Sequence, residues 1–474
     1  MPYGISKRAN DECNAPCASH HRRKGDHMNL TDVFIDTLYT LKSQEMPASV
    51  LFMARKCLLE EIGLIQAGAL LQQEKLTKYL ENFTGEDATV LGLSRKASLQ
   101  NAAFANGISG HSYDFDDGHR YSTVHLASTV IPAVLSVAEK KDLFMKDVLR
   151  GIVIGYECGI RMGRCIQPSH RARGFHSSGT VGALSACMAV CAALDFDRNT
   201  MKDAFAAACS SAAGINEMME NISTMKPYNV GRACHDGITA AFTALAGWNG
   251  PYDPLNGKFS YLAGACDEYN EDWLTLEKYP GYHIEGGYHK PYACCRHTHG
   301  AVYAAEKAFR ESGAALTDIE KIKIEMYGQG VKGHTHTEVP GVVAAKMSTP
   351  YCIGLCLVNG SIGIDSFTEE ALGDDLINDL SARVAIAPDE EMTSWVPEKR
   401  AARAIVTLKD GRSYTFQADY APGEPELPMT TEGFVKKFEA LTKAAGWTKE
   451  KQEKVSDFIL HSEGTAGELI ALQA

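Results

Sequence analysis

The stretch GHSYDFDDGHRYSTVHLASTVIPAVLSVAE, residues 110–139, contains a dense cluster of ionisable groups followed by an apolar run typical of a helix. It brings three carboxylates together with four basic side chains: Asp114, Asp116 and Asp117 with His111, His119, Arg120 and His125. Such crowding can move the pKa of an imidazole toward neutrality, as proton abstraction requires. A solvated start of a helix would have the same composition, so the chemistry alone leaves both interpretations open.

Length and charge limit the class of protein. A chain of 474 residues exceeds the size at which one hydrophobic core keeps growing, so we expect two domains. The formal net charge is −12, and no run of lysine and arginine is interleaved with aromatic residues, so nucleic acid is not an expected partner. An acidic protein can still contain a locally cationic cleft, and a small anionic substrate is therefore compatible with this charge.

Cysteine usage and hydrophobicity indicate the compartment. The 14 cysteines are spread along the chain without CxxC pairs, so we expect reduced thiols. Cys187 with Cys191, and Cys352 with Cys356, are separated by four positions in apolar stretches and are expected to be buried. Residues 1–28 are polar and basic, without the apolar core of a signal peptide or a membrane-length run. We expect a cytoplasmic protein without membrane contact and a flexible N-terminal extension over residues 1–28.

Helix-like and strand-like stretches alternate along the rest of the chain. Stretches rich in small residues are predicted to be helices that pack closely, at 180–196, 203–220 and 233–250. KIKIEMY (321–327) is a predicted strand, and AIVTLKDGRSYTFQ (404–417) is a predicted hairpin around an Asp-Gly turn.

These stretches predict a mainly α fold, in which a large all-helical domain contains an inserted smaller α/β (α+β) lid domain. We assign residues 29–285 to the helical domain and residues 286–428 to the lid domain. Residues 429–474 are predicted to be C-terminal helices that rejoin the helical domain after the proline- and glutamate-rich linker APGEPELPM.

Five blocks, taken in order over about residues 29–470, resemble signature blocks of the MmgE/PrpD family. They are HSYDFDD with the following His125 and VIPAVLSVAE (111–139), GFHSSGTVGAL (174–184), TMKPYNVGRACHDGITAAFTALAGWNGP (224–251), KPYACCRHTHGAVYAA (290–305) and KMSTPYCIGLCLVNGSIGIDSFTEEAL (346–372). The family includes 2-methylcitrate dehydratases, cis-aconitate decarboxylases and iminodisuccinate epimerases. The resemblance implies a large helical domain, a smaller lid domain, a cleft between them and a homodimer.

The resemblance also implies active-site positions. The catalytic candidates are Asp114, His125, His176, Lys226, Lys290 and Tyr351, and the substrate-binding candidates are Arg296, His299, His119 and Cys295. Lysines suit a di- or tricarboxylate, because paired carboxylates are costly to desolvate without cations. His125 and His176 can act as base and acid, in an order the sequence does not assign, with Tyr351 as a hydrogen-bond donor. Buried core residues satisfied by hydrogen bonds are the alternative for His176 and Tyr351.

Four departures from the family pattern fall at predicted cleft positions. Gly118 stands where a threonine usually follows DFDD, and Leu126 replaces the proline of a His-Pro pair. The segment from Asp114 to the following histidine is one residue longer than in animal cis-aconitate decarboxylases. Cys295 stands where those decarboxylases have a histidine, although His299 is nearby. These differences count most against the decarboxylase assignment.

We therefore expect a cofactor-free, metal-free lyase that acts on a small anionic di- or tricarboxylate by acid–base catalysis. The first hypothesis is a hydro-lyase (dehydratase) for a citrate- or 2-methylcitrate-like acid. The alternatives within the family are an epimerase or isomerase of an iminodisuccinate-like dicarboxylate and a cis-aconitate-type decarboxylase.

Other classes of protein have weaker motifs. Two His-x-His pairs could hold a metal in a metal-dependent hydrolase: His297 with His299, and His334 with His336. The segment GQGVKG (328–333) matches a nucleotide-binding pattern, but Pro340 follows too closely for the helix that such a site needs. A catalytically silent binding protein on the same scaffold is the remaining alternative.

Overall fold

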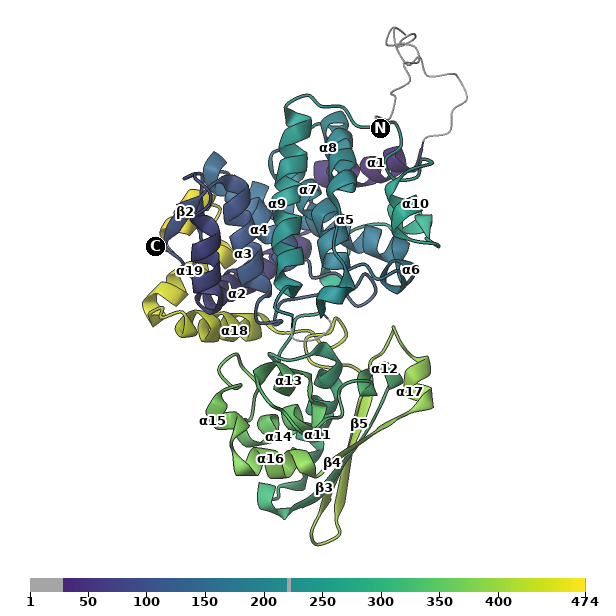
Figure 1. Ribbon diagram of the computed structural model, residues 1–474, viewed down its shortest axis with the longest axis vertical. Helices are drawn as coiled ribbons and strands as arrows, with labels where there is room; N and C mark the ends of the chain where they lie inside the picture. Colours follow the sequence, from purple (N-terminus) through teal and green to yellow (C-terminus); the bar gives the residue numbers. More distant parts are fainter. Residues whose placement is uncertain (1–28, 220–222, 474) are drawn as a thin grey trace, which may run out of the picture.

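The computed structural model describes residues 29–219 and 223–473. The predicted extension over residues 1–28 lies outside the described residues. Within the described ranges the chain is mainly α-helical with two small sheets, as the sequence predicts. A larger helical part and a smaller part that contains a four-stranded sheet are joined by a narrow waist (Figure 1).

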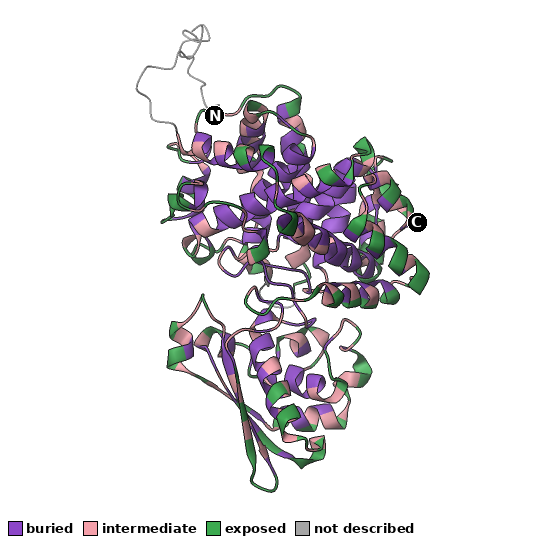
Figure 2. Cartoon of the chain, turned by 180° about the vertical axis from the view of Figure 1, so that it is seen from behind, coloured by how far each residue is buried: buried purple, intermediate pink, exposed green. Residues whose placement is uncertain are grey.

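The larger part is a cluster of long helices around a buried centre. Its main elements are α1 Leu30–Ser43, α2 Ala48–Leu80, α3 Leu99–His111, α4 Ala127–Lys141, α5 Met145–Ile166, α7 Ser177–Ala193, α8 Arg198–Ser211 and α9 Lys226–Leu245, with the two-stranded sheet β1 Ala88–Val90 and β2 Arg95–Ala97. Helix α7 consists mostly of alanine, glycine, serine and cysteine, and all its residues are buried. Small side chains let its neighbours α5 and α9 approach closely, which gives the buried centre visible in Figure 2.

Two helix boundaries differ from the predicted ones. The predicted helix at 203–220 ends as α8 at Ser211, because the backbone becomes extended at Ala212, and Gly214 follows with φ of +150°. Residue 220 itself lies outside the described residues. The predicted helix at 233–250 begins earlier, at Lys226, with a proline in its first turn, and ends at Leu245.

The smaller part has its own hydrophobic core, built on a mixed sheet. The strands β3 Ile319–Met326, β4 Val384–Pro388, β5 Ala402–Leu408 and β6 Ser413–Ala418 have the order β4-β3-β5-β6. Strand β3 pairs parallel with β4 and antiparallel with β5, and the predicted Asp410-Gly411 turn joins β5 to β6. The helices of this part are α11 His299–Ser312, α12 Gly328–Val331, α13 Val342–Met347, α14 Thr349–Asn359, α15 Glu369–Leu372, α16 Asp375–Ala382 and α17 Glu390–Ser394.

The chain then returns to the larger part through α18 Thr431–Ala444, α19 Lys449–His461 and α20 Ala466–Ala471. Helix α18 packs against α2, and Phe434 and Phe438 join the core of the larger part (Figure 1). The core of the smaller part is formed between Tyr292 and Ala418. We propose residues 29–285, 286–428 and 429–474 as the domain boundaries, and the lid role of the smaller part stays a prediction.

Two further predictions concern the described residues. Cys187, Cys191, Cys352 and Cys356 are buried free thiols, as predicted. No helix within residues 29–219 and 223–473 is long and apolar enough to cross a membrane.

Candidate active site

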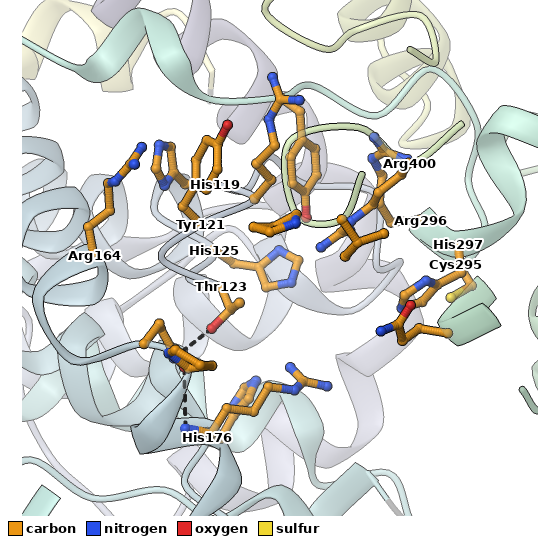
Figure 3. A pocket seen from close by; sticks show the side chains of 18 of the residues that line it. His119, Tyr121, Thr123, His125, Arg164, His176, Cys295, Arg296, His297 and Arg400 are labelled. Carbon is orange, nitrogen blue, oxygen red and sulfur yellow. Dashed lines mark hydrogen bonds between the residues drawn. The ribbon is translucent and has the colours of Figure 1, made fainter. Parts of the chain in front are cut away.

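A cavity of about 670 Å³ lies where the two parts meet. Its walls come from the loop before α4, the N-terminal ends of α7 and α9, and the segment that opens the smaller part. Eight of the ten predicted site residues line it: Asp114, His119, His125, His176, Lys226, Lys290, Cys295 and Arg296. His125 lies near the middle of the group, with Arg164 on one side and Arg296, His297 and Cys295 on the other (Figure 3).

Asp114 is held between two lysines. Its Oδ1 accepts hydrogen bonds from Lys226 Nζ at 2.7 Å and from Lys290 Nζ at 3.0 Å. Burial opposes ionisation of this carboxyl group, but the two ammonium groups outweigh it and hold the pKa of Asp114 well below its usual range. The backbone at Asp114 has φ of +52°, a strained conformation that the surrounding contacts maintain.

The loop that follows Asp114 orients His125. Asp117 Oδ1 accepts from the backbone N–H of Ala127 and so fixes the start of α4. The Nδ1–H of His125 donates to the Asp117 carbonyl at 2.7 Å and lies 3.2 Å from Asp116 Oδ2. Because both partners are acceptors, Nδ1 carries a proton and Nε2 is left to exchange protons with a ligand.

His176 has the opposite tautomer. The side-chain amide of Asn229 on α9 donates to His176 Nδ1 at 3.0 Å, so the proton of the neutral ring is on Nε2. Burial, followed by the charge of Lys226, lowers the pKa of His176 well below its usual range. His176 therefore donates to the cavity through Nε2–H, whereas the Nε2 of His125 is left to exchange a proton with a ligand.

A metal-compatible grouping lies in the same place. Ligand atoms of His111, Asp114 and His125 lie within 4.8 Å of one another. However, the Nδ1 atoms of both histidines contact Asp116, and the Asp114 carboxylate already binds two ammonium groups. A cation bound by Asp114 would be repelled by both lysines, so this arrangement fits proton transfer near an anion better than it fits metal coordination.

Two predicted site residues do not line the cavity. Tyr351 is fully buried in the core of the smaller part, and burial, then Cys352, raises its pKa to about 12. His299 is also fully buried, where its Nε2 contacts the Cys294 carbonyl and its ring packs against Tyr292. Tyr327, whose hydroxyl lies 2.8 Å from His297 Nδ1, supplies a phenol at the cavity wall instead.

Three predicted substrate-binding residues line the cavity, but their contacts and charges within the protein differ from those of free substrate-binding groups. Arg296 is not a free clamp, because it is ion-paired with buried Glu424. Burial, then Asp114, raises the pKa of the Cys295 thiol to about 11, so it is neutral near pH 7. His119 Nδ1 accepts from the Ser122 N–H at 3.1 Å, and burial, then Arg164, lowers the pKa of His119 to about 3.

The His-x-His pairs do not form a metal site among the described residues. His297 faces the cavity, whereas His299 is buried in the core. His334 contacts the Met347 carbonyl and His336 contacts the Ala344 carbonyl. The rings of His297 and His334 stack at 5.3 Å, but no three of these histidines bring their ligand atoms together, so the metal-dependent hydrolase alternative lacks geometric support.

Gly118 is complementary to Tyr288. The two residues exchange backbone hydrogen bonds, Gly118 N–H to the Tyr288 carbonyl at 3.0 Å and Tyr288 N–H to the Gly118 carbonyl at 2.8 Å. A Cβ atom at Gly118 would lie 2.4 Å from Tyr288 Oη. The ring of Tyr288 therefore occupies the space of the threonine side chain usual in the family, which explains this departure physically.

We expect Gly118→Ala to lower the free energy of unfolding by about 1–3 kcal/mol, because the added methyl overlaps the Tyr288 ring. Urea unfolding measures this change. The matched control is Gly264→Ala, since nothing lies within 4 Å of a Cβ there. Tyr288→Leu in the Gly118→Ala background should restore part of the loss; an equal loss in both glycine variants would contradict the explanation.

The structure adds residues that the sequence did not single out. Arg164, Arg171 and Arg400 line the cavity, as do His297 and Tyr327. His297 appeared only in the metal alternative. No local motif marks the three arginines, because whether an arginine faces a cavity is a property of the tertiary structure.

The fold and the cavity define a mainly helical, two-part protein with a cationic pocket lined by four imidazoles. The MmgE/PrpD N-terminal domain matches residues 34–273, and the MmgE/PrpD C-terminal domain matches residues 292–460. The chain belongs to the MmgE/PrpD family.

Among curated proteins, this chain is similar to several cis-aconitate decarboxylases. That of Aspergillus terreus (strain NIH 2624 / FGSC A1156) is 26% identical over 89% of this chain and 90% of the relative. The cis-aconitate decarboxylase of Mus musculus is 24% identical over 87% of this chain and 86% of the relative. That of Homo sapiens is 24% identical over 88% of this chain and 89% of the relative.

Proposed function

We propose that this protein is a lyase that decarboxylates cis-aconitate or a closely related unsaturated tricarboxylate by acid–base chemistry. The supporting observation is the arrangement of His125 and His176 beside Asp114 in a cavity lined by seven cationic side chains and one carboxylate. Such a cavity favours a polyanion and can donate or accept protons next to it. The similarity to cis-aconitate decarboxylases over most of the chain supports the choice of reaction.

The proposed step breaks the bond between a carboxylate carbon and its neighbouring methylene carbon and releases CO2. The electron pair of that bond forms a new double bond at the methylene carbon, and the original double bond shifts its electrons to its far carbon, which takes a proton. A trianion and one proton thus give a dianion and CO2. His125 donates this proton from Nε2, because its Nδ1 is held by the Asp117 carbonyl at 2.7 Å and lies 3.2 Å from the Asp116 carboxylate, which leaves Nε2 for the substrate. His176 donates a hydrogen bond from its Nε2–H to a substrate carboxylate.

Dehydration of a citrate- or 2-methylcitrate-like acid, the first hypothesis from the sequence, remains a prediction that the curated relatives do not support. The homodimer also stays a prediction. Decarboxylation is the better supported alternative. Cys295 stands where animal cis-aconitate decarboxylases have a histidine, but His297 places an imidazole on the same wall of the cavity.

Incubation of the purified protein with cis-aconitate is expected to release CO2 and to form the dicarboxylate product in equal amounts. Proton NMR of the mixture and capture of labelled CO2 measure the two products. Citrate and 2-methylcitrate are tested in parallel by ultraviolet absorbance, because loss of water creates a conjugated double bond. A conjugated product from either hydroxy acid, with no CO2 from cis-aconitate, would replace decarboxylation by dehydration.

A further inference from the structure

The cations that line the cavity differ in how they are compensated. They are Arg120, Arg164, Arg171, Lys226, Lys290, Arg296 and Arg400. Both lysines bind Asp114, while Arg120 pairs with Glu424 and Glu426 and Arg296 pairs with Glu424. The three remaining arginines form no ion pair with any described residue.

One of these three is fixed by aromatic rings. The guanidinium of Arg164 lies 4.0 Å from the ring centre of Tyr121 and 3.7 Å from that of Trp273. Stacking of this kind holds an arginine in place and partly compensates its charge. The guanidinium of Arg164 therefore already has partners within the protein, namely the two aromatic rings.

The side chains of Arg171 and Arg400 have no hydrogen bond, ion pair or ring contact with any described residue. Arg171 belongs to α6, Ser169–Ala172, in the larger part, and Arg400 precedes β5 in the smaller part. Each part of the fold thus contributes to the cavity one guanidinium that has no partner among the described residues. A guanidinium is always charged and binds a carboxylate through two parallel hydrogen bonds, so such a pair is suited to an anion.

The positive charges of both arginines affect the pKa of His297. Its pKa is lowered well below the usual range, first by burial and then by cations that include Arg400 and Arg171. Arg171 also contributes to the lowered pKa of His176, after burial and closer charges. Arg400 lies next to Arg296 and on the same side as His297 (Figure 3). Arg171, Arg400 and His297 all line this one cavity.

The cavity has room for an acid that extends from His125 to these arginines. Its volume of about 670 Å³ lies within the range of roughly 300–1,000 Å³ typical of pockets for drug-sized ligands.

We propose that Arg171 and Arg400 form a second carboxylate-binding subsite, which receives the substrate carboxylate farthest from His125. This inference rests on the proposed function, because it assumes a polycarboxylate whose reacting end lies at His125. It deepens that function by assigning specificity: the subsite selects acids with a distal carboxylate. Since each part of the fold supplies one arginine, the bound carboxylate also bridges the two parts.

The test measures binding of tricarballylate, a saturated tricarboxylate, by isothermal titration calorimetry. The variants are Arg171→Gln, Arg400→Gln and the double variant. Each single change should weaken binding by roughly 10- to 100-fold, since charge-assisted hydrogen bonds are lost. The double variant should lose less than the product of the single losses, because both arginines bind one carboxylate.

Arg173→Gln is the matched control, because Arg173 is two residues from Arg171 but pairs with exposed Asp267 outside the cavity. Its affinity for tricarballylate should equal that of the parent. The melting temperature without ligand should not change in any variant, whereas the ligand-induced rise should shrink only in the cavity variants.

Unchanged affinity in the two cavity variants, strictly multiplicative losses, or no binding of tricarballylate by the parent would overturn the subsite. The proposed function is tested separately with cis-aconitate. Turnover of cis-aconitate with an unchanged KM in the double variant would retain the function and reject the subsite. Arginine-dependent binding of tricarballylate without turnover of cis-aconitate would retain the subsite and reject the function.

Discussion

Replacing His125 by glutamine is expected to lower kcat for cis-aconitate by about 10²- to 10⁴-fold, the usual contribution of a positioned acid–base group. Glutamine can still donate a hydrogen bond to the Asp117 carbonyl, the partner of His125 Nδ1, but it cannot transfer a proton. KM should change much less than kcat, because the cations that bind the carboxylates remain. Steady-state measurement of product formation separates the two constants.

The control for this variant is His461→Gln at the exposed C-terminal end of α19. It should leave kcat and KM as in the parent. Circular dichroism and the melting temperature establish that the His125 variant is folded, and a ligand-induced rise in melting temperature establishes that it binds. A folded, binding-competent variant with kcat within about twofold of the parent would remove His125 from the proton transfer.

The features that the sequence predicts best are those that depend on residues close together along the chain. The strand alternation of β3, the Asp-Gly hairpin and the buried small-residue helix α7 follow from local patterns that the tertiary structure keeps. The positions of Asp114 and His125 are local in the same sense, since one loop between α3 and α4 holds both. The end of α8 does not follow from the apolar pattern, because the chain leaves the helix at Ala212 although small and apolar residues continue beyond it.

The rest of the site depends on contacts between distant segments. The family resemblance brought Lys226 and Lys290 to the same place, but it could not separate a cavity residue from a core residue in one block. The block match therefore predicts Tyr351 as a site residue, whereas the structure buries its side chain in the core of the smaller part. In the same way, the sequence contains Arg171 and Arg400 without indicating that neither has a carboxylate partner. Compensation of a charge is decided by the packed structure, so the subsite could be found only there.

A buried ion network holds the two site-bearing segments together. Lys437 Nζ on α18 lies 2.6 Å from Glu60 Oε1 on α2 and donates to the carbonyls of Phe115 at 2.7 Å and Lys290 at 2.8 Å. Glu60 also contacts His289 Nδ1 at 2.5 Å through its other oxygen. Burial opposes ionisation of Glu60, but Lys437 and His289 outweigh it and lower its pKa. The backbone next to Asp114 and that of Lys290 are thus fixed by one ammonium group.

Lys437→Met should therefore lower the free energy of unfolding by about 3–5 kcal/mol at neutral pH, because it leaves the Glu60 carboxylate buried without its main partner. Urea unfolding measures the loss. In the parent, the depressed pKa of Glu60 stabilises the fold above the ordinary value of 4.5, and this stability is lost as the pH falls through the folded-state pKa. In the variant, burial favours the neutral carboxyl, so the difference between parent and variant should narrow below pH 4.5.

The adjacent Lys436 provides the control for this prediction. It is exposed on the same helix and pairs with exposed Glu432, so Lys436→Met should leave the unfolding midpoint unchanged. Cis-aconitate turnover should also fall in the Lys437 variant and not in the Lys436 variant, because only Lys437 holds the carbonyls of Phe115 and Lys290. A Lys437 variant with the stability of the parent at neutral pH would mean that water enters and solvates Glu60, and the site-bearing segments would then be held by their hydrophobic contacts alone.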